Sequence, residues 1–478
     1  MNVRLYNSNA LRVIALVVAG WSLTGCVGTA PDSRMDEVAV DVPKAWSESR
    51  EAQRGVDQDW IARFGDKQLQ ALVKDAERAN PDLRAAAARV MVAEKQAVAA
   101  GAGRRPLANL TVDGNRAKRN FIGFPIGGPG AGVATQTSNV FGLSFDVQWE
   151  LDVWGRIRAG ESAAVARAEA AAADYQAARV SLAAQVAKTY FGILEARMQV
   201  RTSREALEIL KDTEEVVRQR FRSGQGDPGN VGGQLRLAMS DVEAAKADLA
   251  ESEQRLEVLS RQLESLLGNY PNKRVLGDRD LPELKAVPPA GLPSELLQRR
   301  PDVLAAERRF AASGKSVSEA KRAIFPQIRL TGAGGTSTDV LNQLLNSDFG
   351  VWNLAGGIVQ PILAGGQIRA AYDERLAREQ EALAGLQRTV LDAFLEVENA
   401  LANERWLRRR EEATTRAFEL AYEADQEARR AFRDGVGSIL AVFESQRRMI
   451  GERRRQTAVR LLRLQNRIDL HLALGGDY

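Results

Sequence analysis

The sequence predicts a mainly α-helical protein with a membrane β-barrel part, built from two copies of one unit of strands and long helices. Three observations support this fold class: an internal repeat, two long stretches without proline, and a segment of alternating apolar and polar residues. The chain has 478 residues, 45% of them hydrophobic, and a formal net charge of +4. Beyond a short N-terminal stretch, no apolar run approaches the ~20 residues of a transmembrane helix. A membrane span would therefore have to use strands.

The internal repeat indicates a tandem duplication. One match joins NPDLRAAAARVMVAEKQ, from Asn80, to RPDVLAAERRFAASGKS, from Arg300, at an offset of 220 residues. A second match joins WGRIRA, from Trp154, to GGQIRA, from Gly365, at an offset of 211 residues. Each half is expected to contain a helix, two strands joined by a loop, a very long helix, a Gly-rich turn and a returning helix.

Proline is absent from residues 155–222 and 366–433. If each stretch is one continuous helix, it is roughly 100 Å long. Apolar residues recur at heptad spacing, which is typical of helices that pack as coiled coils. In the first half these residues are Val186, Ile193, Val200 and Leu207, and in the second they are Leu376, Leu383, Val390 and Val397.

Strict alternation of apolar and polar residues marks FGLSFDVQWELDV, from Phe141. It predicts a strand with one apolar and one polar face. A soluble sheet with one wet face is the commoner cause of such a pattern. The strand is as long as the 9–11 residues that cross a bilayer, and long polar or Gly-rich loops are expected over residues 115–138 and 336–350, which favours a membrane barrel. The residues expected to face lipid are Phe141, Leu143, Phe145, Val147, Trp149, Trp352, Leu354 and Ile358.

The expected strand count sets a further condition. Each chain supplies four strands, and about eight is the smallest natural count for a membrane barrel. An open sheet edge cannot face lipid. Several chains would therefore have to share one barrel, whereas a soluble sheet needs no such assembly.

The single cysteine, Cys26, follows a signal-like N-terminus. Arg4 and Arg12 precede an apolar stretch over residues 13–23, which is the layout of a secretory signal peptide. The segment LTGC is similar to a bacterial lipobox, in which the cysteine becomes the lipid-modified first residue of a lipoprotein carrying acyl chains such as palmitate. The alternative is an ordinary signal peptide with an incidental cysteine.

The sequence contains no pattern of catalytic or metal-binding residues. A P-loop, a nucleophile elbow and a metal-spaced set of Cys and His are all absent. The one histidine, His471, is expected on a helix face rather than as a general base. Acidic and basic residues nearly balance, so nucleic acid is not an expected partner. We expect no enzyme activity, no cofactor and no bound metal.

Gly-rich turns follow the two long helices and are the expected functional tips: FRSGQGDPGN and FRDGVGSILA. Glycine ordinarily ends a helix here, and Asp227 and Ser438 stand at N-cap positions, so these residues already have a structural role. Docking of a partner protein is an additional hypothesis. Its candidate residues are Arg222, Gly224, Gly226, Asp227, Gly435, Gly437 and Ser438.

Two segments resemble the signatures of the TolC-like outer-membrane efflux lipoproteins of NodT type. They are LLQRRPDVLAAERRFAASGKSVSEAKRAIFPQIRLTG, residues 296–332, and DWIARFGDKQLQALVKDAERANPDLRAA, from Asp59. The resemblance implies a homotrimer whose strands form one shared twelve-stranded barrel, with a periplasmic α-helical barrel and an equatorial belt. It also implies a passive exit duct in the cell outer membrane for drugs or other small toxic compounds. The implied partners are outer-membrane lipid, a periplasmic adaptor (membrane fusion) protein and an inner-membrane resistance-nodulation-division pump.

The same resemblance suggests a periplasmic gate made of charged residues. The position of the family's acidic ring is matched by Glu444, where the family usually has Asp, and Arg433 and Asp434 are expected near the constriction. The first tip departs from the family, because GDPGNVGGQ replaces the usual helix-starting run. This departure affects the expected fit of the adaptor.

The expected organisation has five segments. They are a signal peptide (1–25), a lipidated N-terminal tether (26–59), a first repeat (60–270), a Pro-rich equatorial connector (271–293) and a second repeat (294–478). Two other functions fit the same features. One is the outer-membrane duct of a type I protein-secretion system, which shares the fold, and the other is a lipid-anchored coiled-coil scaffold without a channel.

Overall fold

The computed structural model describes residues 28–47, 59–121, 133–223, 231–273, 279–284 and 286–476. The chain forms two compact units. Unit 1 comprises Met1–Ser33, Val92–Ala168 and Ala311–Gln380, and unit 2 comprises Arg34–Met91, Glu169–Phe310 and Glu381–Tyr478. In the described part of the chain, no helix is both long enough and apolar enough to cross a membrane.

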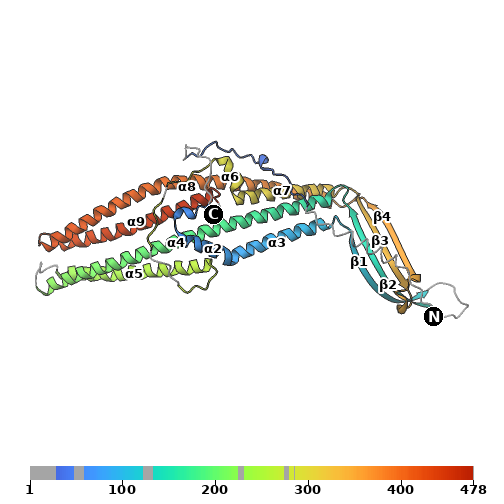
Figure 1. Cartoon of the computed structure of the whole chain (residues 1–478), viewed down its shortest axis with the longest axis horizontal. Helices are drawn as coiled ribbons and strands as arrows, with labels where there is room; N and C mark the ends of the chain where they lie inside the picture. Colours follow the sequence, from blue (N-terminus) through green and yellow to red (C-terminus); the bar gives the residue numbers. More distant parts are fainter. Residues whose placement is uncertain are drawn as a thin grey trace. The chain divides into compact units, whose positions relative to one another are not determined.

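Unit 1 contains one antiparallel sheet of four strands in the order β1-β2-β3-β4 (Figure 1). The strands are β1 (Leu107–Phe121), β2 (Ala134–Leu151), β3 (Gln327–Thr338) and β4 (Gly350–Val359). Each strand pairs with the next one along the chain, although β2 and β3 come from different halves of the duplication. The outer edges of β1 and β4 have no partner among the described residues.

The residues expected to face lipid all lie on one face of this sheet, which we call the apolar face. The register places Leu110 opposite Phe145, Phe145 opposite Gly334 and Gly334 opposite Trp352, so these four residues form one row across the sheet. The alternate residues form a polar face that includes Asn109, Thr111, Asp113, Ser144, Asp146, Gln148 and Thr331. The amphipathic sheet predicted from the sequence is present, and contact of its apolar face with lipid stays a prediction.

The first pair of strands is longer than the sequence predicts. The expected loop over residues 115–138 is wrong at both ends, because 115–121 belong to β1 and 134–138 belong to β2. Backbone pairing continues from Asn115 opposite Val140 to Phe121 opposite Ala134. A ladder of backbone hydrogen bonds does not require apolar side chains, so the strands run on where the apolar pattern stops.

The second strand ends two residues earlier than expected, at Leu151, because residues 152–155 form a turn that leads into a long helix. The carboxylate of Asp152 accepts hydrogen bonds from the backbone N–H groups of Ile157 (2.9 Å) and Arg158 (2.8 Å). These groups belong to the first helical turn, whose donors have no partner inside the helix. Asp152 therefore joins strand to helix.

The helices repeat in the predicted order. The two helices that precede the strand pairs each have 22 residues, α3 (Pro81–Ala102) and α7 (Pro301–Arg322). The two long helices each have 67 residues, α4 (Arg156–Arg222) and α8 (Gln367–Arg433), which confirms the long helices expected from the proline-free stretches. The returning helices are α5 (Val231–Leu266) and α9 (Ile439–Ala473), and two shorter helices are α2 (Lys67–Ala79) and α6 (Pro293–Arg299).

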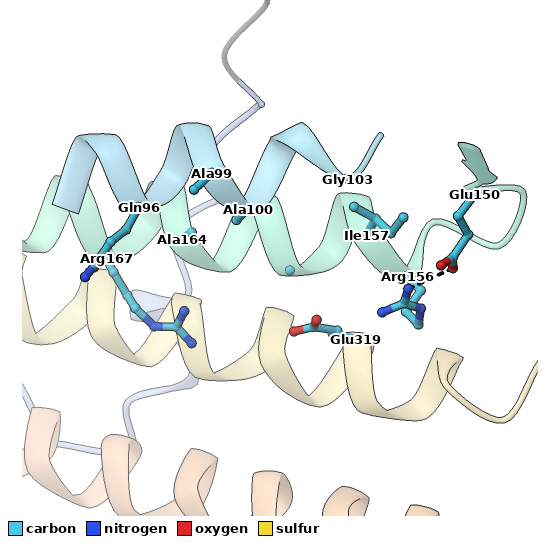
Figure 2. A pocket seen from close by; sticks show the side chains of 11 residues that line it. Gln96, Ala99, Ala100, Gly103, Glu150, Arg156, Ile157, Ala164, Arg167 and Glu319 are labelled. Atoms are coloured by element: carbon cyan, nitrogen blue, oxygen red, sulfur yellow. Dashed lines mark hydrogen bonds and ion pairs between the residues drawn. The ribbon is translucent and has the colours of Figure 1, made fainter. Parts of the chain in front are cut away.

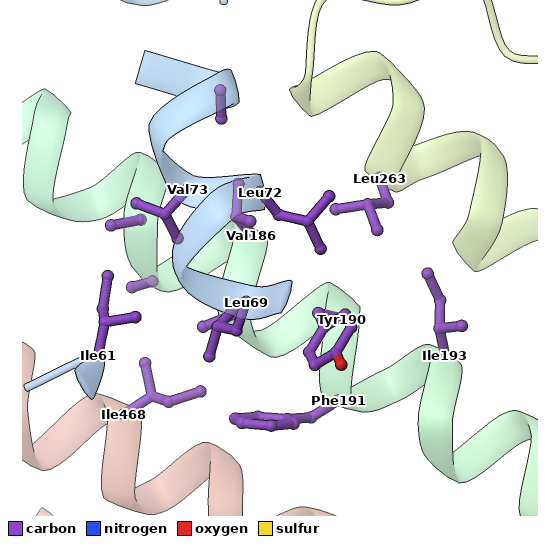
Figure 3. Packing of buried hydrophobic residues seen from close by; sticks show 14 of the residues in the cluster. Ile61, Leu69, Leu72, Val73, Val186, Tyr190, Phe191, Ile193, Leu263 and Ile468 are labelled. Atoms are coloured by element: carbon purple, nitrogen blue, oxygen red, sulfur yellow. The ribbon is translucent and has the colours of Figure 1, made fainter. Parts of the chain in front are cut away.

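The larger core of unit 2 surrounds the middle of α4 (Figure 3). Leu69 and Leu72 of α2, Leu263 of α5 and Ile468 of α9 pack against it. The Tyr190 hydroxyl donates a hydrogen bond to Asp66, the N-cap of α2 (2.8 Å). Burial and the Asp66 carboxylate raise the pKa of Tyr190. The predicted heptad residues of α4 are all buried in unit 2, namely Val186, Ile193, Val200 and Leu207.

A second core in unit 2 includes part of the expected tether. Trp46 is only 3% exposed, and its ring meets that of Phe394 edge to face at 5.9 Å. Its indole N–H is shared between the carbonyls of Ala290 (3.2 Å) and Gly291 (3.1 Å). The described tether residues near Trp46 are therefore packed against the fold rather than extended away from it.

The arginine of the RRPD segment has a structural role. The Arg300 guanidinium pairs with Asp302 (2.7 Å) and Glu396 (2.7 Å) and donates to the carbonyl of Ala473 at the end of α9 (3.1 Å). One buried cation thus joins α7, α8 and α9. These partners accept hydrogen bonds from the guanidinium N–H groups of Arg300, which would be costly to bury without partners.

His471 is a buried structural residue. It stacks on Trp60 with ring centroids 5.8 Å apart. Burial, together with the positive charges of Arg467 and Arg63, lowers the pKa of His471 to about 3. The imidazole is therefore neutral at physiological pH, consistent with the expectation that it is no general base.

We predict that Gly335→Ala destabilises the sheet, whereas Gly334→Ala does not. A Cβ at residue 335 would lie 1.9 Å from the Leu143 carbonyl oxygen, so β2 and β3 would have to separate locally. A Cβ at residue 334 would meet nothing within 4 Å. Overpacking of this kind costs about 1–3 kcal/mol. Thermal denaturation of the purified protein should show a lower midpoint for Gly335→Ala only. Equal midpoints for the two variants would contradict the close approach.

Candidate functional site

The second helix tip is a tight turn between α8 and α9 in unit 2. Gly435 has φ +79°, a left-handed conformation that ends α8. The N–H of Gly437 donates to the carbonyl of Ala431 (2.9 Å), and a Cβ at residue 437 would lie within 3 Å of backbone atoms. Ser438 is the N-cap of α9 and accepts a hydrogen bond from the N–H of Leu440 (3.2 Å). The structural roles predicted for these tip residues are present.

An apolar cluster joins the four helices beside this turn. Its buried members are Val217, Ala238, Phe432, Ile439, Val442 and Phe443, which come from α4, α5, α8 and α9. Arg220 closes the cluster, with its guanidinium carbon 3.8 Å from the centre of the Phe432 ring. The same side chain donates to the Phe432 carbonyl (3.2 Å), one of the last carbonyls of α8. Arg220 therefore joins the end of α4 to the end of α8.

A buried polar layer lies further along the same helices. Gln446 of α9 is fully buried and donates to the Thr213 hydroxyl of α4 (2.9 Å). Asp425 of α8 is also fully buried, with Arg429 at 2.8 Å and the Ser445 hydroxyl at 3.3 Å. Groups of this kind favour one register of the four helices, because sliding would leave a buried polar group without its partner.

The three expected gate residues are exposed near the tip and do not pair with one another. Glu444 contacts Arg447 (3.0 Å) and Arg448 (3.3 Å) along its own helix. Arg433 is the last residue of α8, and Asp434 follows it in the turn. Within the described part of the chain, no ion pair joins Arg433 to Asp434 or to Glu444. A gate built on these residues would need contacts from another chain.

The remaining docking candidates belong to the first tip. Arg222 is exposed at the end of α4. Gly224, Gly226 and Asp227 lie outside the described residues, as does the lipidation candidate Cys26. Arg220 was not among the residues singled out from the sequence. The signal that could have found it is its spacing of three residues from Val217, which places both side chains on one face of α4.

A cavity of about 610 Å³ lies in unit 1 where α3, α4 and α7 meet the end of β2 (Figure 2). Arg156 forms an ion pair with Glu150 (2.7 Å), and Arg167 donates to the Ser316 hydroxyl (2.7 Å). Burial lowers the pKa of Arg167, and nearby Arg375 lowers it further. The charged residues of the lining are Arg156, Arg167, Glu150 and Glu319, so positive and negative charges balance. The two arginines join neighbouring elements of unit 1, and the lining residues do not form a catalytic arrangement.

The N-terminal segment enters unit 1 near this junction. The Ser162 hydroxyl of α4 donates to the Thr29 carbonyl (2.8 Å). A Cβ at Gly28 would lie 2.5 Å from the carboxyl carbon of Glu161, so the backbone lies closely against the helix. Glu161 in turn pairs with Arg104 (2.7 Å). Gly28 and Thr29 thus lie against the second turn of α4.

These features define a class of protein. Among the described residues, no group of three or more His, Cys, Asp or Glu could hold a metal ion. A four-stranded amphipathic sheet and a duplicated set of very long helices are the parts of a TolC-like outer-membrane channel.

The chain belongs to the outer membrane efflux protein family, whose model matches residues 72–269 and 292–476. The resemblance predicted from the sequence is confirmed. Members of this family are transport channels, and the chain is an outer-membrane efflux channel protein.

Similar proteins extend over nearly the whole chain. The pyoverdine export outer membrane protein OpmQ of Pseudomonas putida is 30% identical over 476 residues, which are 98% of each chain. The cation efflux system protein CusC of Escherichia coli is 29% identical, over 96% of this chain and 97% of that protein. The solved structure of the outer-membrane channel OprN superposes with a TM-score of 0.83 at 27% identity, covering 94% of this chain and 99% of that chain.

We predict that Arg220→Ala loosens the second tip, whereas Arg222→Ala, two residues further on, does not. The first change removes a cation–π contact and a hydrogen bond, together worth about 1–2 kcal/mol. Local opening of the tip should then be about tenfold more frequent. Amide hydrogen exchange over residues 432–443 measures this. Equal exchange in the two variants would show that Arg220 does not hold the tip.

Proposed function

We propose that this protein is the outer-membrane exit duct of a tripartite resistance-nodulation-division efflux system. Three copies pair β1 of one chain with β4 of the next, which closes twelve strands into one barrel. The observation that carries this proposal is that the outer edges of β1 and β4 have no partner in the part of the chain that the structure describes. Unpaired backbone groups cannot face lipid, and closure into a barrel removes both edges.

The height of the apolar face supports a membrane position for the sheet. On β2 the apolar face runs from Leu151 to Phe141, ten residue steps or about 34 Å along the strand. Strands of membrane barrels tilt by about 35–45°, so the apolar face would be about 26 Å tall. The outward apolar band of such barrels is about 25 Å tall. The agreement favours a barrel over a soluble sheet.

The long helices of the three copies would line a tunnel through the periplasm. A periplasmic adaptor protein and an inner-membrane pump would meet its tips, with Arg222, Gly435 and Ser438 as docking candidates. The names of similar proteins, pyoverdine export and cation efflux, support export of small molecules. The duct is passive and needs no cofactor, because the pump supplies the driving force. Drugs or other small toxic compounds are the proposed cargo.

The tips would form the gate. All three residues, Arg433, Asp434 and Glu444, are exposed, and the ion pairs of Glu444 lie along its own helix, so these residues would meet charges of neighbouring copies around the three-fold axis. Each exposed pair contributes about 1 kcal/mol or less, so several must act together. An adaptor that binds only the separated tips would shift the balance toward the open state by its differential affinity.

Reconstitution in planar lipid bilayers tests the duct and its gate. The wild-type protein should run as a heat-sensitive trimer on gels and conduct ions at a low, closed level. Glu444→Gln or Arg433→Ala should raise single-channel conductance, because each removes charged contacts that hold the tips together. Unchanged conductance in both variants would contradict the gate, and a monomer without conductance would contradict the duct itself.

We further propose that Cys26 is the lipid-modified first residue of the mature chain. The position of Gly28 and Thr29 beside the start of α4 would place the acyl chains at the membrane. The proposed barrel crosses the whole bilayer and should hold the trimer in place without the anchor.

Cys26→Ser, expressed behind a signal peptide that is cleaved without lipidation, should therefore still yield some trimer in the outer membrane. Membrane fractionation followed by gel analysis without heating measures this. Complete loss of the trimer from that fraction would show that the anchor is required.

A further inference from the structure

The apolar face of the sheet becomes basic at its loop end, where β1 ends and β2 begins. Beyond the row of Gly114 and Phe141, this face continues on β1 with Arg116 and Lys118. Both side chains are exposed, and among the described residues neither forms an ion pair. The sequence placed these residues in a loop, where their direction would be undefined. The strand register instead shows that both side chains lie on the apolar face.

The polar neighbours on this part of the face contain no acid. Arg116 is opposite Asn139, and Lys118 is opposite Thr137. Directly opposite residues have Cβ atoms about 5 Å apart, so each cation lies beside a neutral amide or hydroxyl group. The arrangement offers two cations and two neutral hydrogen-bonding groups to one ligand. A ligand with phosphate groups and sugar hydroxyls matches both.

The height of the two cations is that of lipid headgroups. Arg116 is one same-face step beyond the row of Phe141, or about 7 Å along the strand, and Lys118 is about 14 Å beyond it. With the tilt of barrel strands these distances become about 5 and 10 Å above the apolar face. The interfacial layer of a bilayer is about 5–8 Å thick on each side, so Arg116 would lie within it and Lys118 near its outer edge. Lipid-facing Arg or Lys is costly at the bilayer centre and nearly neutral near the interface, which fits this position.

We propose that Arg116 and Lys118 form a binding site for the phosphate groups of outer-leaflet lipopolysaccharide. The loop end of the sheet is opposite the end where the helices begin, so in the proposed barrel it faces the outer leaflet. The guanidinium of Arg116 binds a phosphate through paired N–H groups, and the ammonium of Lys118 adds a second charge. Asn139 and Thr137 bind neighbouring sugar hydroxyls. The site rests on the proposed function, because it requires the sheet to be in the outer membrane.

The strand supplies a matched control one residue away. Arg119 follows Lys118 on β1 and lies opposite Gln136 on the polar face, so it points away from lipid. Arg116→Gln with Lys118→Gln should weaken binding of the purified, full-length trimer to lipopolysaccharide about 30-fold, because each basic group near an anionic surface contributes about fivefold to binding. Lys118→Gln alone should weaken it about fivefold, and Arg119→Gln should change it by less than twofold.

Binding is measured by surface plasmon resonance against immobilised lipopolysaccharide at fixed salt. Enzymatic removal of the lipid A phosphates should lower wild-type binding to the level of the double variant. Equal binding by wild type and double variant, or equal loss in Arg119→Gln, would overturn the site. Full displacement by millimolar inorganic phosphate, or equally tight binding to phosphatidylglycerol vesicles, would overturn the assignment to lipopolysaccharide.

The assembly of each variant separates this inference from the proposed function. All variants should run as heat-sensitive trimers and conduct like the wild type, because none of the changed residues lies at the tips. A wild-type protein that forms no conducting trimer would contradict the duct. A conducting trimer whose binding does not depend on Arg116 and Lys118 would contradict only the lipid site. If the double variant does not assemble, the same comparison is made with Lys118→Gln.

Discussion

The unpaired backbone of the two edge strands is the constraint on which the rest of this structure depends. An antiparallel sheet of four strands satisfies its inner ladders and leaves one edge of β1 and one edge of β4 without partners among the described residues. In water such edges are a risk of aggregation, and in lipid they are not tolerated. Pairing of these edges between identical copies, which closes the sheets into a barrel, would avoid both problems. The trimer proposed above would satisfy both edges in this way.

Buried charges in this protein hold helices in register rather than carry out chemistry. Glu404 of α8 is 3% exposed and meets both Arg467 (2.8 Å) and Arg463 (3.2 Å) of α9. Arg300 joins three helices in the same way, through Asp302 and Glu396. A pair of this kind adds little net stability compared with apolar packing, but removal of one partner is costly. Such pairs therefore oppose sliding between long helices whose apolar seams would tolerate several registers.

The apolar cluster at the tip and the buried polar layer beside it are small compared with the main core of unit 2. The core around α2 and the middle of α4 contains many large side chains, whereas the cluster at the tip has six buried members. Opening of a region depends on how much buried contact it must give up, so small clusters at helix ends open more readily than the main core. We therefore expect the tip to open more often than the core of unit 2.

The sequence by itself determined the periodic features of this protein. The duplication, the two 67-residue helices and the alternation through Phe141–Leu151 could all be predicted, because heptad and two-residue periods follow from helix and strand geometry. Gly435 and Ser438 could likewise be assigned to the helix ends from local chemistry alone. These predictions depend only on neighbours along the chain.

Only the tertiary structure decided which residues meet across the chain. Pairing with β2 extends β1 through Arg116 and Lys118, although their side chains carry no strand pattern, and only the register shows which face they share. The contact of Arg220 with Phe432 joins residues 212 positions apart, and the burial of Trp46 depends on Ala290 and Phe394. Local periodicity carries no information on such partners, because they are selected by packing between elements that are distant in sequence.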